Sequence, residues 1–185
     1  VLGAVDSGLE GVYTLTYTVS DSSGNQAIAT RTVSVKDTLA PVITLVGDAT
    51  VFHEVNTTYT DQGVSAVDAV EGSVAITTTG EVNSNALGAY TLTFQAFDSH
   101  GNLAISNRTI QVVDTQVPEI FLSGDSLVSH QLGSAYTDAG ALLVDNYDPD
   151  VSLLGVGVVN VNIAGLYTLT YAAEDSSKNQ AIPVT

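Results

Sequence analysis

The amino-acid sequence predicts an all-β protein made of small β-sandwiches in tandem, and three observations support that prediction. Apolar and polar residues alternate with a period of two, and no stretch keeps the period of an amphipathic helix. One long block of sequence recurs along the chain at a fixed interval. The composition is rich in Thr, Val, Ser and Gly, and its acidic residues are mostly Asp, which favours strands joined by Asx-type turns.

The repeat is clearest in one motif. GVYTLTY at residues 11–17 returns as GAYTLTF at 88–94 and as GLYTLTY at 165–171, so the repeat has a period of 77. Placing each boundary after a linker aspartate, Asp37 or Asp114, divides the chain into three parts. Residues 1–37 are the C-terminal part of a repeat, 38–114 a complete repeat, and 115–185 a repeat without its last strand segment. We therefore expect the chain to be a window on a longer array.

The complete repeat predicts its elements in order. Strands are expected at 42–45, 50–55, 58–67 and 74–79, because each run is bounded by Gly, Asn or Asp. A hairpin follows, with alternation over 90–96, a turn at 98–102 and alternation again over 104–112. Roughly seven short strands are what a small β-sandwich needs. The predicted buried face is Tyr90, Leu92, Phe94, Ile110 and Val112, with Tyr167, Leu169 and Tyr171 in the last repeat.

Composition excludes several classes of function. Four Lys+Arg residues against 20 Asp+Glu give a net charge of −16, which repels nucleic-acid phosphates and anionic lipid surfaces. The absence of Cys excludes disulfides, thiolate metal sites and cysteine nucleophiles. No apolar run is long enough to insert into a membrane. No Ser, His and acid arrangement stands out, so we expect no enzyme, no catalytic residue and no organic cofactor.

Several motifs carry a family resemblance. Gly88-x-Tyr90-x-Leu92 resembles the strand F signature of the immunoglobulin fold. With the linker motif at 37–41, Tyr-Thr-Asp-x-Gly at 59–63 and Asp-Ser-x-Gly-Asn at 98–102, the unit resembles the cysteine-free immunoglobulin-like repeats of large bacterial surface adhesins, of a cadherin- or hyalin-repeat-like kind. The resemblance implies tandem immunoglobulin-like β-sandwiches that are secreted, often bind calcium near domain junctions, and serve as stalks or adhesive modules.

Carboxylates are expected to gather where one repeat meets the next. In the sandwich topology the incoming linker, the loop after the second strand and the loop of the last hairpin lie at one end of the domain. With few cations to neutralise them, these carboxylates repel one another unless a hard cation such as Ca²⁺, which accepts six to eight oxygen ligands, sits between them. The expected ligands are Asp37, Asp68, Glu71 and Asp98 in the middle repeat, and Asp114, Asp145, Asp148, Asp150 and Asp175 in the last.

The expected sites differ in strength, and an alternative reading stands beside them. The middle repeat has Ala69 and Ser73 where the last has Asn146 and Asp150, so its site should be weaker. The alternative is that Asp98 and Asp175 cap tight turns and that the linker aspartates are solvated.

Other repeated residues favour structural roles. His53 and His130 share one repeat position, which favours structure over metal binding. Arg31 and Arg108 share another, and a guanidinium that pairs with a carboxylate or stacks on a tyrosine is expected there.

The expected function is a non-enzymatic extracellular stalk or spacer of a bacterial surface protein. Its expected partners are neighbouring repeats of the same or another copy, with a surface glycan or protein receptor as a further candidate. One alternative is a subunit of a self-assembling filament or surface layer, because residues 32–37 of another copy could complete the last repeat by strand addition. Another is a sugar-binding accessory module of a secreted hydrolase.

Overall fold

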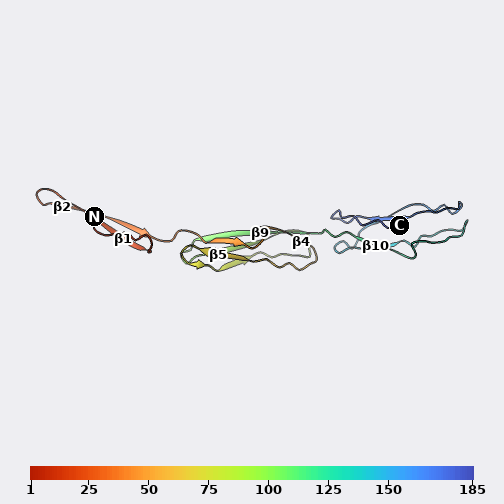
Figure 1. Ribbon diagram of the computed structural model, residues 1–185, viewed down its shortest axis with the longest axis horizontal. Coiled ribbons are helices and arrows are strands. Elements are labelled where there is room, and N and C mark those ends of the chain that lie inside the picture. The colour runs from red at the N-terminus through yellow and green to blue at the C-terminus, as the bar shows by residue number, and fades with distance from the viewer. The chain divides into compact units, whose positions relative to one another are not determined.

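The computed structural model describes residues 1–185, and every regular element in it is a β-strand (Figure 1). The first repeat holds β1 (Gly11–Ser20) and β2 (Gln26–Val35). The middle repeat holds β3 (Val42–Leu45), β4 (Thr50–Glu54), β5 (Val64–Asp68), β6 (Gly72–Ser73), β7 (Ile76–Thr79), β8 (Gly88–Phe97) and β9 (Leu103–Val113). The last holds β10 (Glu119–Leu122), β11 (Ala141–Val144), β12 (Leu153–Val156) and β13 (Thr170–Ala173). The all-β prediction is confirmed, and no helix long and apolar enough to cross a membrane is present.

The chain forms two compact units whose limits differ from those of the sequence repeats. The first unit comprises residues 1–48, 62–79 and 93–107, and the second comprises 49–61, 80–92 and 108–185. Each unit therefore contains one end of the middle repeat together with the repeat that adjoins that end.

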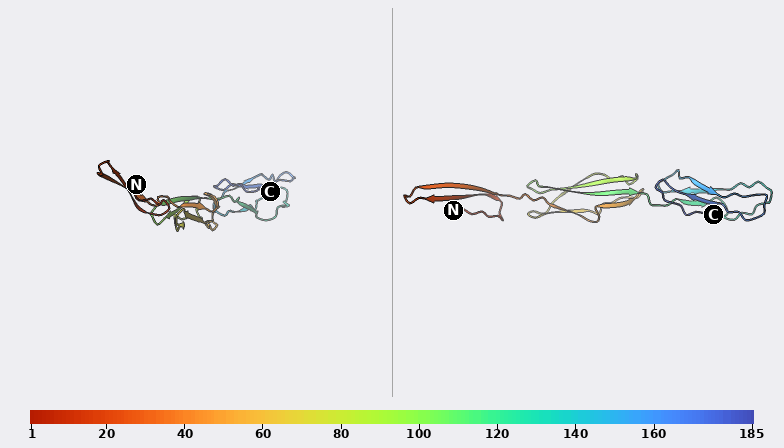
Figure 2. Two further views of the ribbon diagram at one scale, coloured as in Figure 1. Left: turned by 60° about the vertical axis from the view of Figure 1, so that its left-hand side comes forward. Right: turned by 90° about the horizontal axis from the view of Figure 1, so that it is seen from above.

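Antiparallel pairing dominates the first unit. Strands β1 and β2 form a ten-residue hairpin in which Gly11 lies opposite Val35, visible as two long adjacent arrows in Figure 2. Strand β5 lies between β3 and β6 in a three-stranded sheet. Strand β7 pairs with the second half of β8, with Ile76 opposite Ala96.

The second unit contains one parallel pair. Residues 50–54 of β4 lie beside residues 109–113 of β9 and run in the same direction. Strand β9 has β4 as its neighbour on one side and β8 on the other. In the last repeat, β10 pairs with β11 and β12 with β13, both antiparallel.

The predicted register of the long hairpin is confirmed. Leu92, Phe94, Ile110 and Val112 are buried, with Phe94 only 2% exposed, while Thr91 faces solvent. This alternation places one face of β8 and β9 in the core of the middle repeat.

The tyrosine that opens each hairpin makes a corner contact instead of entering the core. The Tyr90 hydroxyl donates to the Ala86 carbonyl oxygen at 3.0 Å. The equivalent bonds are Tyr13 to Leu9 at 2.8 Å and Tyr167 to Ile163 at 2.9 Å. A hydroxyl bound to backbone a few residues upstream is the tyrosine corner of immunoglobulin-like sandwiches. Tyr90 and Tyr167 are accordingly half-buried, and Leu169 is half-buried as well, so the predicted burial of these three residues is wrong. Tyr171 is buried as predicted.

The expected strand at 58–67 is wrong in its first half, because β5 begins only at Val64. Tyr59 and Asp61 make side-chain polar contacts in this segment. The Tyr59 hydroxyl donates to the Asp61 carboxylate, and the fully buried Arg108 guanidinium lies 2.5 Å from the same carboxylate. Gly63 then takes a φ of 99°, which a residue with a side chain rarely adopts.

Truncation of the core should destabilise the middle repeat. Leu92→Ala should lower the free energy of unfolding by roughly 2 to 5 kcal/mol, the cost of a large-to-small change at a buried site. Thr91→Ala, on the opposite face of the same strand, is the matched control and should change it by less than about 0.5 kcal/mol. Urea unfolding measures both, and a larger loss for the threonine variant would contradict the observed register.

Candidate metal centres

Each hairpin turn is held together by an aspartate. In the middle repeat, the Asp98 carboxylate accepts the backbone N–H groups of His100 and Asn102 at 2.9 and 2.8 Å, and the Asn102 side-chain amide at 2.6 Å. Asp175 accepts the backbone and side-chain N–H groups of Asn179 at 2.8 and 2.7 Å. These Asx-type contacts give Asp98 and Asp175 the capping role that the sequence offered as an alternative. They also fix both carboxylates at one end of a repeat.

The first cluster lies where the first repeat meets the middle one. Carboxylate oxygens of Asp37, Asp68 and Asp98 lie within 4.8 Å of one another. Asp68 is only 3% exposed. One of its oxygens accepts the N–H groups of Val70 and Glu71 at 2.7 and 3.1 Å, and the other is buried without a hydrogen-bond partner.

The linker aspartate Asp37 follows the same pattern. One oxygen accepts the Leu39 N–H at 3.0 Å, and the second is buried and unpartnered. The first cluster therefore contains two buried oxygens without a protein donor, one on Asp37 and one on Asp68. Asp37 is half-buried, so its carboxylate is only partly solvated.

Glu71 and His100 border this cluster. The Glu71 carboxylate accepts the backbone N–H of Ser99 at 2.8 Å and also the Ser99 hydroxyl. His100 Nδ1 lies 3.6 Å from Glu71, and its Nε2 lies 2.9 Å from the Glu10 carboxylate of the first repeat. The hydrogen bond with Glu10 raises the pKa of His100. Glu10 also accepts the Asp37 N–H at 2.9 Å, so it joins the first repeat to the linker.

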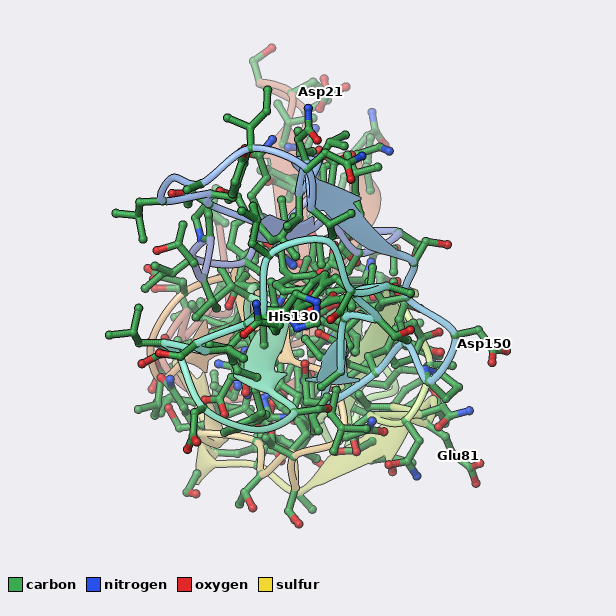
Figure 3. All side chains as sticks on the ribbon, turned by 90° about the vertical axis from the view of Figure 1, so that its right-hand side faces the viewer. Asp21, Glu81, His130 and Asp150 are labelled. Atoms are coloured by element: carbon green, nitrogen blue, oxygen red, sulfur yellow. The ribbon has the colours of Figure 1, made fainter.

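The second cluster lies where the middle repeat meets the last one. Carboxylate oxygens of Asp114, Asp148 and Asp175 lie within 4.8 Å of one another. One oxygen of Asp114 and one of Asp145 are buried without a partner, while their other oxygens accept backbone N–H groups of the linker and of the 145–148 loop. Asp150 does not join this group, because its side chain is exposed and projects outward in Figure 3.

The electrostatics of the second cluster reflect this crowding. Burial raises the pKa of Asp114, hydrogen bonding to Gln116 and Ser177 lowers it in part, and the negative charges of Asp175 and Asp145 add to the net rise. Asp148 behaves differently, because its hydrogen bonds from the Ser176 side chain and backbone lower its pKa.

In the first cluster, burial alone would raise the pKa of Asp98. The hydrogen bonds from Asn102 and His100 outweigh that effect, and the pKa of Asp98 is lowered.

The donor atoms in both clusters suit a hard cation. They are carboxylate oxygens from three separate segments. One buried oxygen in each of Asp37, Asp68, Asp114 and Asp145 has no hydrogen-bond partner. Ca²⁺ and Mg²⁺ prefer such oxygens, and a site of several flexible carboxylates favours the larger ion. Two of the few cationic side chains are engaged elsewhere, Arg108 with Asp61 and Lys178 with Glu174.

The remaining residues singled out from the sequence lie outside these clusters. His53 packs edge-on against Tyr59 at a ring distance of 5.2 Å, and His130 packs the same way against Tyr136 at 5.3 Å. Their Nε2 atoms lie 3.1 Å from the carbonyl oxygens of Thr57 and Ser134. Arg31, the counterpart of Arg108, is exposed.

Sequence reasoning missed the glutamates that link neighbouring repeats. Glu54 accepts the backbone N–H of Thr115 at 3.1 Å and its hydroxyl at 2.6 Å, as Glu10 accepts the Asp37 N–H in the first unit. Glu10 and Glu54 occupy different repeat positions. The repeat period therefore gave no signal for them.

The fold and the acidic repeat junctions define a tandem array of immunoglobulin-like domains. A family model described as the immunoglobulin-like domain of bacterial surface proteins matches residues 1–35, 43–112 and 120–184. The chain belongs to this family of bacterial surface protein domains, and the recognition made from the sequence is confirmed. Membership supports an extracellular structural or adhesive role at the cell surface.

Two further similarities were found. The chain is 28% identical over 185 residues to an uncharacterized 81.3 kDa protein of Acholeplasma phage L2, covering 94% of this chain and 24% of that protein. It therefore spans about a quarter of that relative. The crystal structure of the lipoprotein BT2262 from Bacteroides thetaiotaomicron matches with a TM-score of 0.35 and 20% identity, covering 74% of this chain and 61% of the other.

Neutralising one carboxylate of the second cluster should stabilise the cation-free protein. In a chelating buffer at neutral pH, Asp114→Asn should raise the free energy of unfolding by about 1 kcal/mol, because it removes a buried charge and its new amide can donate to a neighbouring carboxylate. Asp150→Asn, an exposed aspartate outside the cluster, is the control and should have little effect. Thermal unfolding in EDTA measures both changes, and destabilisation by Asp114→Asn would show that its charge is already compensated.

Proposed function

We propose that the chain is a non-enzymatic extracellular spacer of a bacterial surface protein, with Ca²⁺ stiffening the junctions between its immunoglobulin-like repeats. One observation carries the proposal. At both junctions the linker aspartate and the following loop aspartate each bury a carboxylate oxygen that no protein group satisfies: Asp37 with Asp68, and Asp114 with Asp145.

Buried, unpartnered carboxylates are costly in the absence of a compensating charge. Removing an ionised group from water without a partner costs several kcal/mol, and like charges within a few ångströms add repulsion. A divalent cation removes both penalties at once. The arrangement recurs one repeat period later along the chain, which indicates that it is a feature of the repeat and not a local accident.

The residues proposed to hold the cations come from three segments at each junction. Asp37, Asp68 and Asp98 would serve the first, with Glu71 at its border. Asp114, Asp145, Asp148 and Asp175 would serve the second. Because each set joins the linker to two loops of the following repeat, a bound cation would restrict the linker torsions. Asp150 is left out of the proposed set because it is exposed.

A second candidate function, assembly through strand addition, is favoured by one feature of the last repeat. In the middle repeat residues 50–54 pair with β9, whereas the equivalent residues 127–131 form no strand. A cavity of about 510 Å³ lies beside them, with Leu122, Leu127, Leu132 and Leu169 in its lining. An extended segment of another copy could fill it. Light scattering separates the two functions, since a spacer stays monomeric and a filament subunit polymerises. A surface glycan or protein receptor also stays a candidate ligand, for which a glycan array is the first test.

Calcium removal should destabilise the protein and loosen its junctions. Binding to the folded state alone adds RT ln(1 + [Ca²⁺]/Kd), or roughly 2.7 kcal/mol at a hundredfold excess over Kd. Adding EDTA should therefore lower the melting temperature and broaden the small-angle scattering distance distribution. Asp145→Asn should remove most of the calcium effect at the second junction, and Asp150→Asn should leave it intact.

The comparison between these two aspartates makes the test specific. Both substitutions remove one negative charge from the same loop, so non-specific screening by calcium would affect them equally. If EDTA changes neither the melting temperature nor the scattering, or if both variants behave alike, the calcium proposal fails.

A further inference from the structure

The two junctions differ in how they hold the preceding repeat, and the difference centres on Asn146. This residue lies in the 145–148 loop of the second cluster. Its side-chain N–H donates to Glu54 at 3.3 Å, and its backbone carbonyl oxygen accepts the Asn56 side-chain amide at 2.7 Å. Both partners belong to the middle repeat. The first junction has Ala69 at the equivalent position and cannot form the side-chain contact.

These contacts extend to the linker. Glu54 also accepts the backbone N–H and hydroxyl of Thr115, the residue after the linker aspartate. One carboxylate of the middle repeat thus holds both the linker and the 145–148 loop. The same loop includes Asp145, one of whose oxygens is buried without a partner. The 145–148 loop therefore contributes both to the second proposed cation site and to the hydrogen bonds with the middle repeat.

We infer that Asn146 is the positioning residue that couples cation binding at the second junction to the orientation of the middle repeat. A cation held by Asp114 and Asp145 would fix the 145–148 loop, and Asn146 would pass that constraint to Glu54 and Asn56. The inference rests on the proposed function, because it requires a cation at the second cluster. The inference goes beyond the proposed function in one respect. Cation binding would make the second junction rigid through the Asn146–Glu54 contact, which the first junction lacks.

The buried oxygen of the Asn146 side chain supports this assignment. That oxygen accepts no hydrogen bond, whereas the amide nitrogen is directed to Glu54. A buried amide oxygen without a hydrogen-bond partner costs free energy, even when the amide nitrogen of the same side chain is hydrogen-bonded, unless a cation or another donor contacts the oxygen. A nearby cation would be the partner of this oxygen. The Asn146 amide would then connect the metal site, through its oxygen, to Glu54 of the preceding repeat, through its nitrogen.

The absence of Cys and Trp from the chain suits a direct test. Thr91→Cys at an exposed position of β8 and Ser126→Cys in the last repeat provide two unique spin-label sites on either side of the second junction. Double electron–electron resonance then measures the width of the distance distribution with and without Ca²⁺. Terbium luminescence, sensitised by Tyr147 in the same loop, measures binding at the second site, because the first site has Val70 at that position.

Four versions of the full chain test this coupling. In the wild type, Ca²⁺ should narrow the distance distribution. Asn146→Ala should weaken terbium binding by about tenfold, as for other residues that orient a metal ligand. At saturating Ca²⁺ it should narrow the distance distribution less than the wild type does, because only the backbone contact with Asn56 remains. Asn146→Asp keeps an oxygen for the cation but cannot donate to Glu54. It should therefore bind terbium at least as well as the wild type, and Ca²⁺ should still narrow its distance distribution less than that of the wild type. Ala69→Asn, the matched change at the first junction, should leave this distribution unchanged.

The outcomes separate the inference from the proposal beneath it. If the wild type binds neither terbium nor Ca²⁺, the proposed function fails and the inference falls with it. A second outcome is that the wild type binds Ca²⁺ but its distance distribution narrows no more than that of Asn146→Ala at saturating Ca²⁺. In that case Asn146 does not couple cation binding to the orientation of the middle repeat, and only the inference is overturned. Glu54→Ala is a second variant on the other side of the contact and should reproduce the reduced narrowing. Circular dichroism confirms that each variant is folded.

Discussion

The burial of carboxylates in a chain with very few cations is the constraint on which the repeat junctions depend. Only four Lys and Arg residues face 20 Asp and Glu, and the fully buried Arg108 is engaged with Asp61. The carboxylates of the junction aspartates must therefore find hydrogen-bond partners other than Lys and Arg side chains. Each gives one oxygen to backbone N–H groups, which fixes the linker and the loops, and Asp37, Asp68, Asp114 and Asp145 keep the other oxygen buried without a protein partner.

The same side chains thus have two roles that sequence reasoning had set against each other. Asp98 and Asp175 form Asx-type turns and lie in the acidic clusters as well. The turn contacts use carboxylate lone pairs, but each oxygen can accept more than one interaction. Capping therefore positions these carboxylates and leaves room for a cation. A turn residue and a candidate ligand are the same residue here because the turn lies at the junction.

The sequence was most informative where the repeat and the period-two pattern coincide. Together they predicted β3, the long hairpin and the burial of Leu92 and Ile110, because alternate faces of a strand are set by local chemistry. Residues 59–63 escaped this reasoning because the contact of Asp61 with Arg108 is made between residues 47 positions apart. The candidate sites were predictable only in part. Repeated aspartates at the loops and linker identified the clusters, with Asp150 the exception, since it lies past Pro149 on an exposed part of the loop. Glu54 and Asn146 contact each other across 92 positions, and no periodicity indicates such a pair, because each repeat uses its own residues to contact its neighbour.

The parallel pairing of β4 with β9 has a mechanical consequence. Strand β4 lies near the beginning of the middle repeat and β9 at its end, and five residue pairs join them in the same direction. Tension along the polypeptide pulls the start of one strand and the end of the other away from each other, along the strand axis. The hydrogen bonds between the two strands are then loaded together in shear and are not broken one after another. In a surface protein under mechanical tension, this pair of strands would therefore be a main source of resistance to unfolding.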